Sequence, residues 1–193
     1  MEDLRLFFQL GWNHIISIDA LDHLLFLTAL MAVYQLRDWK KVLVLITAFT
    51  IGHAATLIAS INEWFEFNSR WVEFLIPLTI LLTALNNIFN PFRRSSNQPS
   101  YRYFMALAFG LIHGMGFAST LRFMLADNQK IVIPMLSFNL GIEAGQLLVV
   151  LVLLMTSTGV LALTRLGHQY WNILISFITG TAALFICVLR WPI

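Results

Sequence analysis

Charged residues and cysteines are scarce in this chain of 193 residues. Only 11% of the residues are Asp, Glu, Lys or Arg, whereas a soluble globular domain contains about 25%. This composition excludes a soluble enzyme, a disordered tail and a nucleic-acid-binding domain. The net charge of +2 is also too small to indicate a polyanionic partner. The single cysteine, Cys187, excludes an intrachain disulfide and a thiolate metal cluster.

The chain consists mainly of long apolar segments. Hydrophobic residues make up 59% of the chain, and the mean hydropathy is +0.77. Because a helix needs about 20 residues to cross a bilayer, we predict an all-α, polytopic membrane bundle that forms a single transmembrane domain over residues 1–193. Roughly six spanning helices are expected, over residues 19–36, 42–62, 72–90, 103–125, 131–156 and 170–190. The apolar stretch that precedes them, residues 4–18, is interpreted as an interfacial or re-entrant helix.

The basic residues predict the orientation in the lipid bilayer, because Lys and Arg in short loops are retained on the cytoplasmic side. In this chain they are enriched after the first, third and fifth predicted spans, at Arg37, Lys40, Lys41, Arg93, Arg94, Arg102 and Arg165. Both termini are therefore predicted to lie outside the cytoplasm. Asp19, Asp22 and Glu73 then fall at the outer face, where carboxylates attract cations.

Three ionisable side chains fall near the middle of predicted spans: His53, His113 and Glu143. Such a group costs roughly 3 kcal/mol or more in hydrocarbon, so it requires a partner, a water-filled cavity or a metal. Because the three lie at similar depth on different helices, they can converge on one site. Asn139 and Gln146 lie four residues before and three residues after Glu143, on the same helix face. We expect them to support the ligands or to line a pathway.

A second cluster of metal-ligating residue types surrounds the start of the first predicted span. Asp19 and Asp22 are spaced i, i+3, and Asp19 and His23 are spaced i, i+4, so on a helix the three share a face. His14 precedes them, and Glu73 begins another span at the same outer level. Imidazole and carboxylate groups suit divalent nickel, cobalt, zinc, copper or iron. We predict a nickel, cobalt or zinc ion here, and the alternative that the intramembrane polar groups only cross-link helices stays open.

Four segments resemble the HupE/UreJ family of bacterial membrane proteins: Gly-Trp-Asn-His-Ile…Leu-Asp-His-Leu-Leu-Phe (11–26), Thr-Ala-Phe-Thr-Ile-Gly-His (47–53), Phe-Gly-Leu-Ile-His-Gly-Met-Gly-Phe (109–117) and Phe-Asn-Leu-Gly-Ile-Glu-Ala-Gly-Gln (138–146). Members of that family occur beside hydrogenase and urease genes and are regarded as nickel or cobalt permeases or metal-delivery accessories. Carried over by position, the resemblance implies a metal-handling set of His14, Asp22, His23, His53, His113 and Glu143.

The chain departs from the family pattern in one place. The family's usual spacing is His, five residues, then Asp-His, whereas here seven residues separate His14 from Asp22. This insertion gives weight to Asp19 as a ligand. It also suggests a subgroup whose metal need not be nickel.

Three hypotheses for the function follow. The first is a metal-ion permease of the bacterial inner membrane, which captures a divalent ion at the outer carboxylates and binds it at mid-membrane. The second is a zinc-dependent intramembrane hydrolase, with Glu143 or Asp22 as the general base. The third is a non-catalytic accessory subunit of the membrane. Whether the chain forms a homo-oligomer or has another membrane partner stays open.

Overall fold

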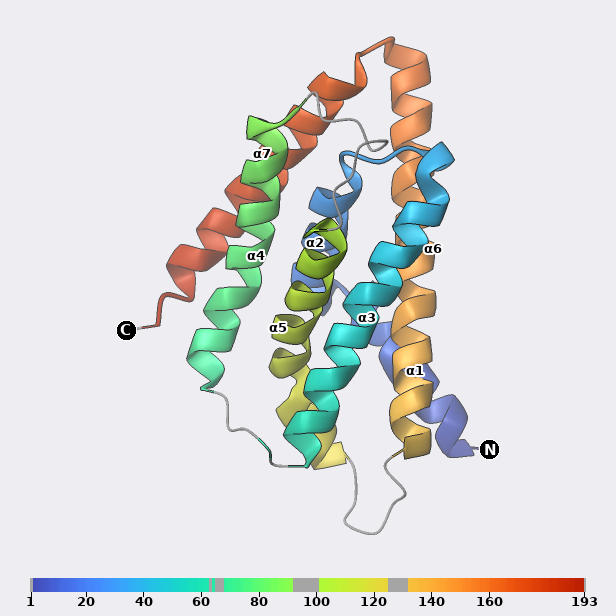
Figure 1. Ribbon diagram of the computed structural model, residues 1–193, viewed down its shortest axis with the longest axis vertical. Helices are drawn as coiled ribbons and strands as arrows, with labels where there is room; N and C mark the ends of the chain where they lie inside the picture. The colour runs from blue at the N-terminus through green and yellow to red at the C-terminus, as the bar shows by residue number, and fades with distance from the viewer. Residues whose placement is uncertain (1, 63, 65–67, 92–100, 125–131, 193) are drawn as a thin grey trace.

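The fold is a bundle of α-helices (Figure 1), described here from a computed structural model over residues 2–62, 64, 68–91, 101–124 and 132–192. The helices are α1 (Glu2–Ile16), α2 (Leu21–Met31), α3 (Trp39–Ile61), α4 (Ser69–Phe89), α5 (Tyr101–Met124), α6 (Val132–Thr164) and α7 (His168–Leu189). Short 3-10 segments cover Ile18–Ala20 and Leu36–Asp38. No strand occurs in these ranges, so the predicted all-α class is confirmed. A lipid-exposed backbone must satisfy its own hydrogen bonds, and a helix does so within one segment.

Four of the described helices are long and apolar enough to cross a membrane, which supports a membrane protein. They cover Leu36–Ser60, Ser69–Phe89, Val132–Thr164 and His168–Leu189. A bent pair of helices at the N-terminus would make a fifth span if the pair crosses as one. The expected six spans are therefore not confirmed. α6 also continues beyond its predicted end, because its 33 residues run apolar as far as Leu163.

The first predicted span is wrong in its boundaries. The structure has no continuous helix over residues 19–36; instead α2 covers only 11 residues, a length of about 16 Å, which is short of the roughly 30 Å hydrocarbon core. α1 precedes it, and the segments Leu4–Ile16 and Leu21–Met31 meet at an angle of 65°. The stretch interpreted as interfacial or re-entrant is thus the first half of a broken helix.

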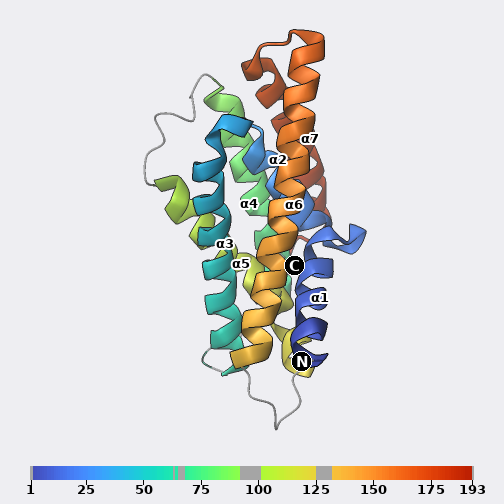
Figure 2. The ribbon, with the colours of Figure 1, turned by 90° about the vertical axis from the view of Figure 1, so that its right-hand side faces the viewer.

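Three pairs of helices pack side by side: α3 with α5, α1 with the first half of α6, and α4 with α7 (Figures 1 and 2). In the first two pairs the backbones touch through glycines. A Cβ added at Gly52 or Gly110 would collide with a backbone oxygen of the partner helix, and the same holds at Gly11 and Gly141. Small residues of this kind allow close packing of helices in membranes, where no hydrophobic driving force brings helices together.

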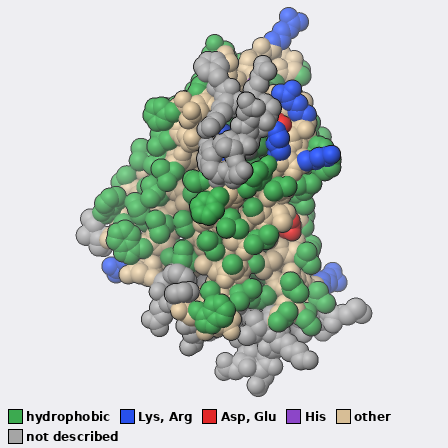
Figure 3. Space-filling model, viewed as in Figure 1, with side chains coloured by type: hydrophobic (Ala, Val, Ile, Leu, Met, Phe, Trp, Pro, Cys, Tyr) green, Lys and Arg blue, Asp and Glu red, His purple; other side chains and the backbone are tan. Residues whose placement is uncertain are grey.

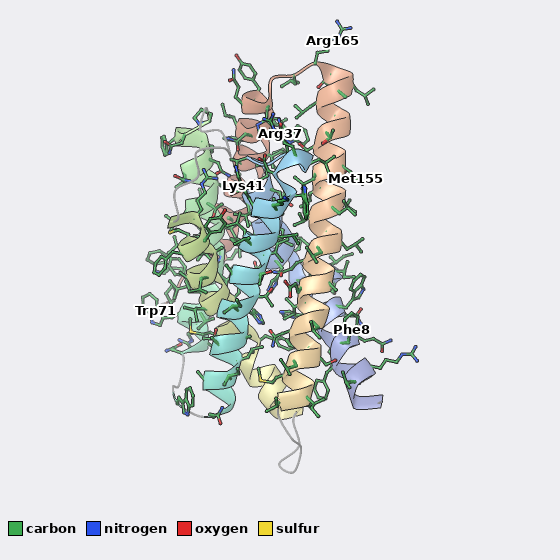
Figure 4. The ribbon with its side chains drawn as sticks, turned by 45° about the vertical axis from the view of Figure 1, so that its right-hand side comes forward. Phe8, Arg37, Lys41, Trp71, Met155 and Arg165 are labelled. Carbon is green, nitrogen blue, oxygen red and sulfur yellow. The ribbon has the colours of Figure 1, made fainter. Side chains whose placement is uncertain are left out.

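The surface agrees with a lipid environment. Figure 3 shows a face that is covered mainly by hydrophobic side chains, with the few Lys and Arg residues near its ends and edges. Arg37, Lys41 and Arg165 lie toward the end of the bundle at which α3 begins, and Met155 points outward from α6 (Figure 4). Charge is thus concentrated where a bilayer would end.

Candidate metal centre

The break between α1 and α2 brings two histidines together with a third on α3. His14 lies in the last turn of α1, His23 in the first turns of α2, and His53 past the middle of α3. Each offers one ring nitrogen, and these three atoms lie within 4.8 Å of one another. Three imidazoles at this separation could hold a single metal ion.

Four of the six imidazole nitrogens are buried and have no hydrogen-bond partner among the described residues. His53 is 0% exposed and His23 is 7% exposed. Nε2 of His14, Nε2 of His23 and both ring nitrogens of His53 are without partners. Most buried polar side-chain atoms in proteins are hydrogen-bonded, and a buried polar atom without a partner costs about 1–3 kcal/mol. A cation at the centre of the three rings would satisfy the lone pairs of these nitrogens.

His113, on α5, lies beside this triad. The centroid of its ring is 5.2 Å from that of His23. Nδ1 of His113 donates to the backbone oxygen of Phe109 at 2.8 Å, because a carbonyl oxygen can only accept. This bond fixes the tautomer and leaves the Nε2 lone pair free, and Nε2 is buried with no partner among the described residues. A metal-binding histidine usually donates its second ring nitrogen in this way.

Phenylalanine rings enclose the four histidines. The centroid of the Phe117 ring is 4.3 Å from that of His14, and the centroid of the Phe49 ring is 5.1 Å from that of His113. Phe138 stacks on Phe117 with an interplanar angle of 6°. These apolar rings lower the local dielectric constant, so the interaction of a cation with its ligands would be stronger than in solvent.

A pocket of about 360 Å³ reaches the histidines between the α1–α2 break, α4, α5 and the end of α7. Its wall includes His14, His23 and His113, together with Asp22 and Glu73. Glu73 is exposed, so the pocket joins the surface to the buried rings.

Asp22 connects the pocket to the C-terminal end of α7. Arg190 Nη1 donates to Asp22 Oδ2 at 2.9 Å, while Oδ1 of Asp22 is buried and has no partner among the described residues. Arg190 is not among the site residues that the sequence analysis predicts. The ion pair joins residues 168 positions apart, and no local pattern in the sequence indicates it.

A family model described as HupE / UreJ protein matches residues 1–192. The chain belongs to the HupE/UreJ family. Neither a curated protein nor a solved structure gives a match to it. Family membership and the apolar helices together identify a membrane protein.

The structure of this HupE/UreJ protein merges two sets of residues that the sequence analysis kept apart. His14 and His23 were expected at an outer mouth and His53 at mid-membrane, yet the three imidazoles share one site. The seven residues between His14 and Asp22 include the 3-10 segment Ile18–Ala20, at which the chain turns. The longer spacing is therefore compatible with a close approach of His14 to His23, whose ring centroids are 4.7 Å apart.

Glu143 and its neighbours on α6 are engaged elsewhere. Thr47 Oγ1 donates to Glu143 Oε1 at 2.7 Å, and Thr50 Oγ1 donates to Gln146 Oε1 at 3.0 Å. Both bonds join α3 to α6. Asn139 Nδ2 donates to the backbone oxygen of residue 135 at 2.8 Å, and its buried Oδ1 has no partner in the described part of the chain. The side chain of Asp19 lies outside the part that the structure describes.

Proposed function

We propose that this protein is a permease for a divalent transition-metal ion in the bacterial cytoplasmic membrane. The observation that carries the proposal is the convergence of three imidazoles, each of which has at least one buried ring nitrogen without a hydrogen-bond partner among the described residues. His14, His23 and His53 would bind the ion directly. His113 would be a fourth ligand, since its free Nε2 lies beside the triad.

The donor set supports nickel, cobalt or zinc as the substrate. Neutral imidazole is a ligand of intermediate softness that suits these ions, whereas copper(I) prefers thiolate and thioether sulfur. The group of converging ligand atoms contains imidazoles alone. Nickel and cobalt are also the ions that the family resemblance implies.

The pocket would be the route by which the ion reaches the histidines. Glu73 and Asp22 line it, and their carboxylates would attract a cation and begin to replace its water. The pocket is lined by Glu73 near the start of α4 and by Arg190 just after α7, whereas Arg37, Lys41 and Arg165 lie toward the end of the bundle where α3 begins (Figure 4). Because basic loops face the cytoplasm, the pocket and both termini would face the outside.

The first test is metal binding by the purified protein in detergent, measured by calorimetry and elemental analysis with Ni²⁺, Co²⁺ and Zn²⁺. We expect one ion per chain. Loss of His53 or His113 should weaken binding by more than the roughly 10–100-fold that loss of an outer hydrogen-bond partner costs. The matched control is His168→Ala, since His168 contacts the backbone oxygen of Tyr34 at 3.4 Å instead of the site. His53→Gln keeps a polar side chain at this position, so a loss of metal binding in this variant is less easily explained by misfolding than a loss in His53→Ala.

The second test is uptake of radioactive nickel or zinc into proteoliposomes. A permease should transport the ion, and His53→Gln should abolish uptake while His168→Ala should not. A protein that holds no stoichiometric Ni²⁺, Co²⁺ or Zn²⁺ would overturn the proposed site. A protein that binds metal tightly but passes none across the membrane would overturn the permease assignment and leave the hydrolase and accessory alternatives.

A further inference from the structure

Two of the three helix pairs have the same construction. In the pair α3/α5 and in the pair α1/α6 the two helices are parallel. Going toward the C-terminus of one helix, its contacts move toward the C-terminus of the partner helix. On α3 and α5 the contacts run from Phe49 against Gly110 to His53 against Gly114. On α1 and α6 they run from Gly11 against Phe138 to Ile15 against Gly145.

The glycine contacts of the two pairs match position by position. In each pair, both helices carry a contact glycine. Each glycine packs against a backbone oxygen of the partner helix, and the residue that carries this oxygen lies three positions before the partner helix's contact glycine. The contacts are Gly110 with the oxygen of Phe49, Gly52 with that of Leu107, Gly11 with that of Phe138, and Gly141 with that of Phe8. This pattern alone allows α5 to correspond to α1 or to α6, and the positions of the histidines select α1, so that α3 corresponds to α6.

The correspondence extends to the metal centre. His113 follows Gly110 by three residues, and His14 follows Gly11 by three residues. Each of the two histidines also faces the equivalent phenylalanine: the ring centroids of His113 and Phe49 are 5.1 Å apart, and those of His14 and Phe138 are 6.0 Å apart. The shared residues form Gly-x-x-His and Phe-x-x-Gly motifs, which are too short to indicate a repeat from the sequence alone.

The two pairs run in opposite directions. α3 and α5 descend in the view of Figure 1, whereas α1 and α6 ascend, and the same is seen after the quarter turn of Figure 2. Structural repeats of opposite direction are the framework of many transporters. In such proteins the substrate site lies near the bilayer midplane between the repeats, with broken helices beside it. Here the histidines and the α1–α2 break lie between the pairs.

We propose that the pairs α1/α6 and α3/α5 are equivalent units of opposite direction, here called repeats, that rock against each other about the histidine cluster, and that the α3–α6 seam is the second aperture of the pathway. The seam is defined by the hydrogen bonds Thr47–Glu143 and Thr50–Gln146. This inference rests on the proposed function. In this proposal, Glu143 and Gln146 keep the pathway closed on the side of the histidine cluster that lies opposite the pocket.

The position of the seam supports this assignment. Thr50 and Thr47 precede His53 by one and two turns of α3, or about 4.5 and 9 Å along the axis. The seam therefore lies on the side of the site where α3 begins. The pocket opens on the opposite side, near the start of α4. In the described structure the histidines are thus open to one side through the pocket, while on the other side two side-chain hydrogen bonds, of 2.7 and 3.0 Å, join the repeats.

The experiment measures distances between spin labels in a Cys187→Ser background, which the single cysteine makes straightforward. Exposed positions carry the labels: Ile51 on α3, Phe104 on α5 and Leu140 on α6. Addition of saturating Ni²⁺ should change the distance between positions 51 and 140, across the seam, by more than about 2 Å. The distance between positions 51 and 104, within one repeat, should stay constant.

A matched pair of substitutions tests the gate without any metal. Thr50→Val removes a bond across the seam, whereas Thr56→Val removes a bond within one repeat, from Thr56 Oγ1 to the oxygen of Leu111 at 2.8 Å. The two threonines are equally buried, at 6% and 7% exposed. An interhelical hydrogen bond of average strength corresponds to about a threefold change in an equilibrium. Thr50→Val should therefore raise the seam-open population about threefold, and Thr56→Val should leave it unchanged.

The outcomes separate this proposal from the proposed function. If nickel binds but neither the metal nor Thr50→Val alters the distance across the seam, the rocking of the repeats is refuted and the metal site stands. If nickel does not bind but Thr50→Val alters the distance across the seam alone, the rocking stands and the metal site is refuted. Equal changes within and across the repeats would also overturn the proposal, because the repeats would then not move as units.

Discussion

Replacing His53 by leucine distinguishes a metal ligand from a residue that only holds helices together. His53 is fully buried, and neither of its ring nitrogens has a partner among the described residues. Each such buried group costs about 1–3 kcal/mol, so an apolar residue removes a penalty of about 2–6 kcal/mol. A hydrophobic side chain of similar volume costs up to about 1.5 kcal/mol in imperfect packing. We therefore expect the metal-free His53→Leu protein to be more stable than the parent by about 2 kcal/mol.

Metal should reverse this order. At a free concentration of 100 times the dissociation constant, a bound ion stabilises the parent protein by about 2.7 kcal/mol. The leucine variant lacks a ligand and gains nothing at that concentration. The parent should then exceed the variant by about 0.7 kcal/mol, the difference between about 2.7 and about 2. The measurement is denaturant unfolding in detergent, followed by the fluorescence of the six tryptophans, with Ni²⁺ and then with a chelator.

One result would refute this reasoning. If His53→Leu lowers the stability of the metal-free protein by more than about 1 kcal/mol, the imidazole contributes the energy of a structural hydrogen bond. The control is His168→Leu. Its ring is half-buried and lies 3.4 Å from the oxygen of Tyr34, so we expect a change below about 1 kcal/mol that metal does not affect.

Further substitutions test the packing and the pocket. Gly110→Ala should destabilise the protein by about 1–3 kcal/mol in the same unfolding assay, because a Cβ there collides with a backbone oxygen of α3. Gly159→Ala should be neutral or stabilise by up to about 1 kcal/mol, since nothing lies within 4 Å of its Cβ position. Arg190→Gln should tighten nickel binding up to about fivefold in calorimetry, because Asp22 loses the cation that now neutralises it and a partly exposed ion pair contributes about 0.2–1 kcal/mol. Asn87→Leu should destabilise by about 1 kcal/mol, through loss of the 2.8 Å bond to the oxygen of residue 29.

The middle and end of the fold could be predicted from hydropathy. The expected ranges 42–62, 72–90 and 170–190 agree within a few residues with α3, α4 and α7, because each apolar run ends in polar residues that a bilayer interior would not accept. The range 131–156 ends eight residues before α6 does. Thr156, Ser157 and Thr158 interrupt the apolar run there, but a helix accommodates such residues by bonding their hydroxyls to its own backbone, as Thr158 does to the oxygen of Leu154 at 2.7 Å.

The N-terminal third could not be predicted in the same way. The break after Ile16 contains neither glycine nor proline, only Ser-Ile-Asp-Ala, so the local sequence gives no signal for it. The ligand types were nevertheless identifiable, since ionisable residues in apolar helices are rare. Which of them meet is a tertiary property. A straight helix through both residues would separate His14 and His23 by about 14 Å along its axis, whereas the bend brings their ring centroids to 4.7 Å.

The break between α1 and α2 explains why the longer spacing between His14 and Asp22 is compatible with the histidine cluster. α1 ends beside the cluster, and a helix C-terminus carries partial negative charge, which favours a cation. α2 begins there with Asp22 in its first turn, where a carboxylate compensates the partial positive charge of the N-terminus. The exposed amides of the turn are satisfied locally, by bonds from Ser17 N to the oxygen of Asn13 at 2.9 Å and from Ala20 N to the oxygen of Ser17 at 3.0 Å. The distance from His14 to His23 therefore depends on the angle between α1 and α2 and not on the spacing along one continuous helix. The break can accommodate the two residues by which this chain exceeds the family spacing without separating the histidines.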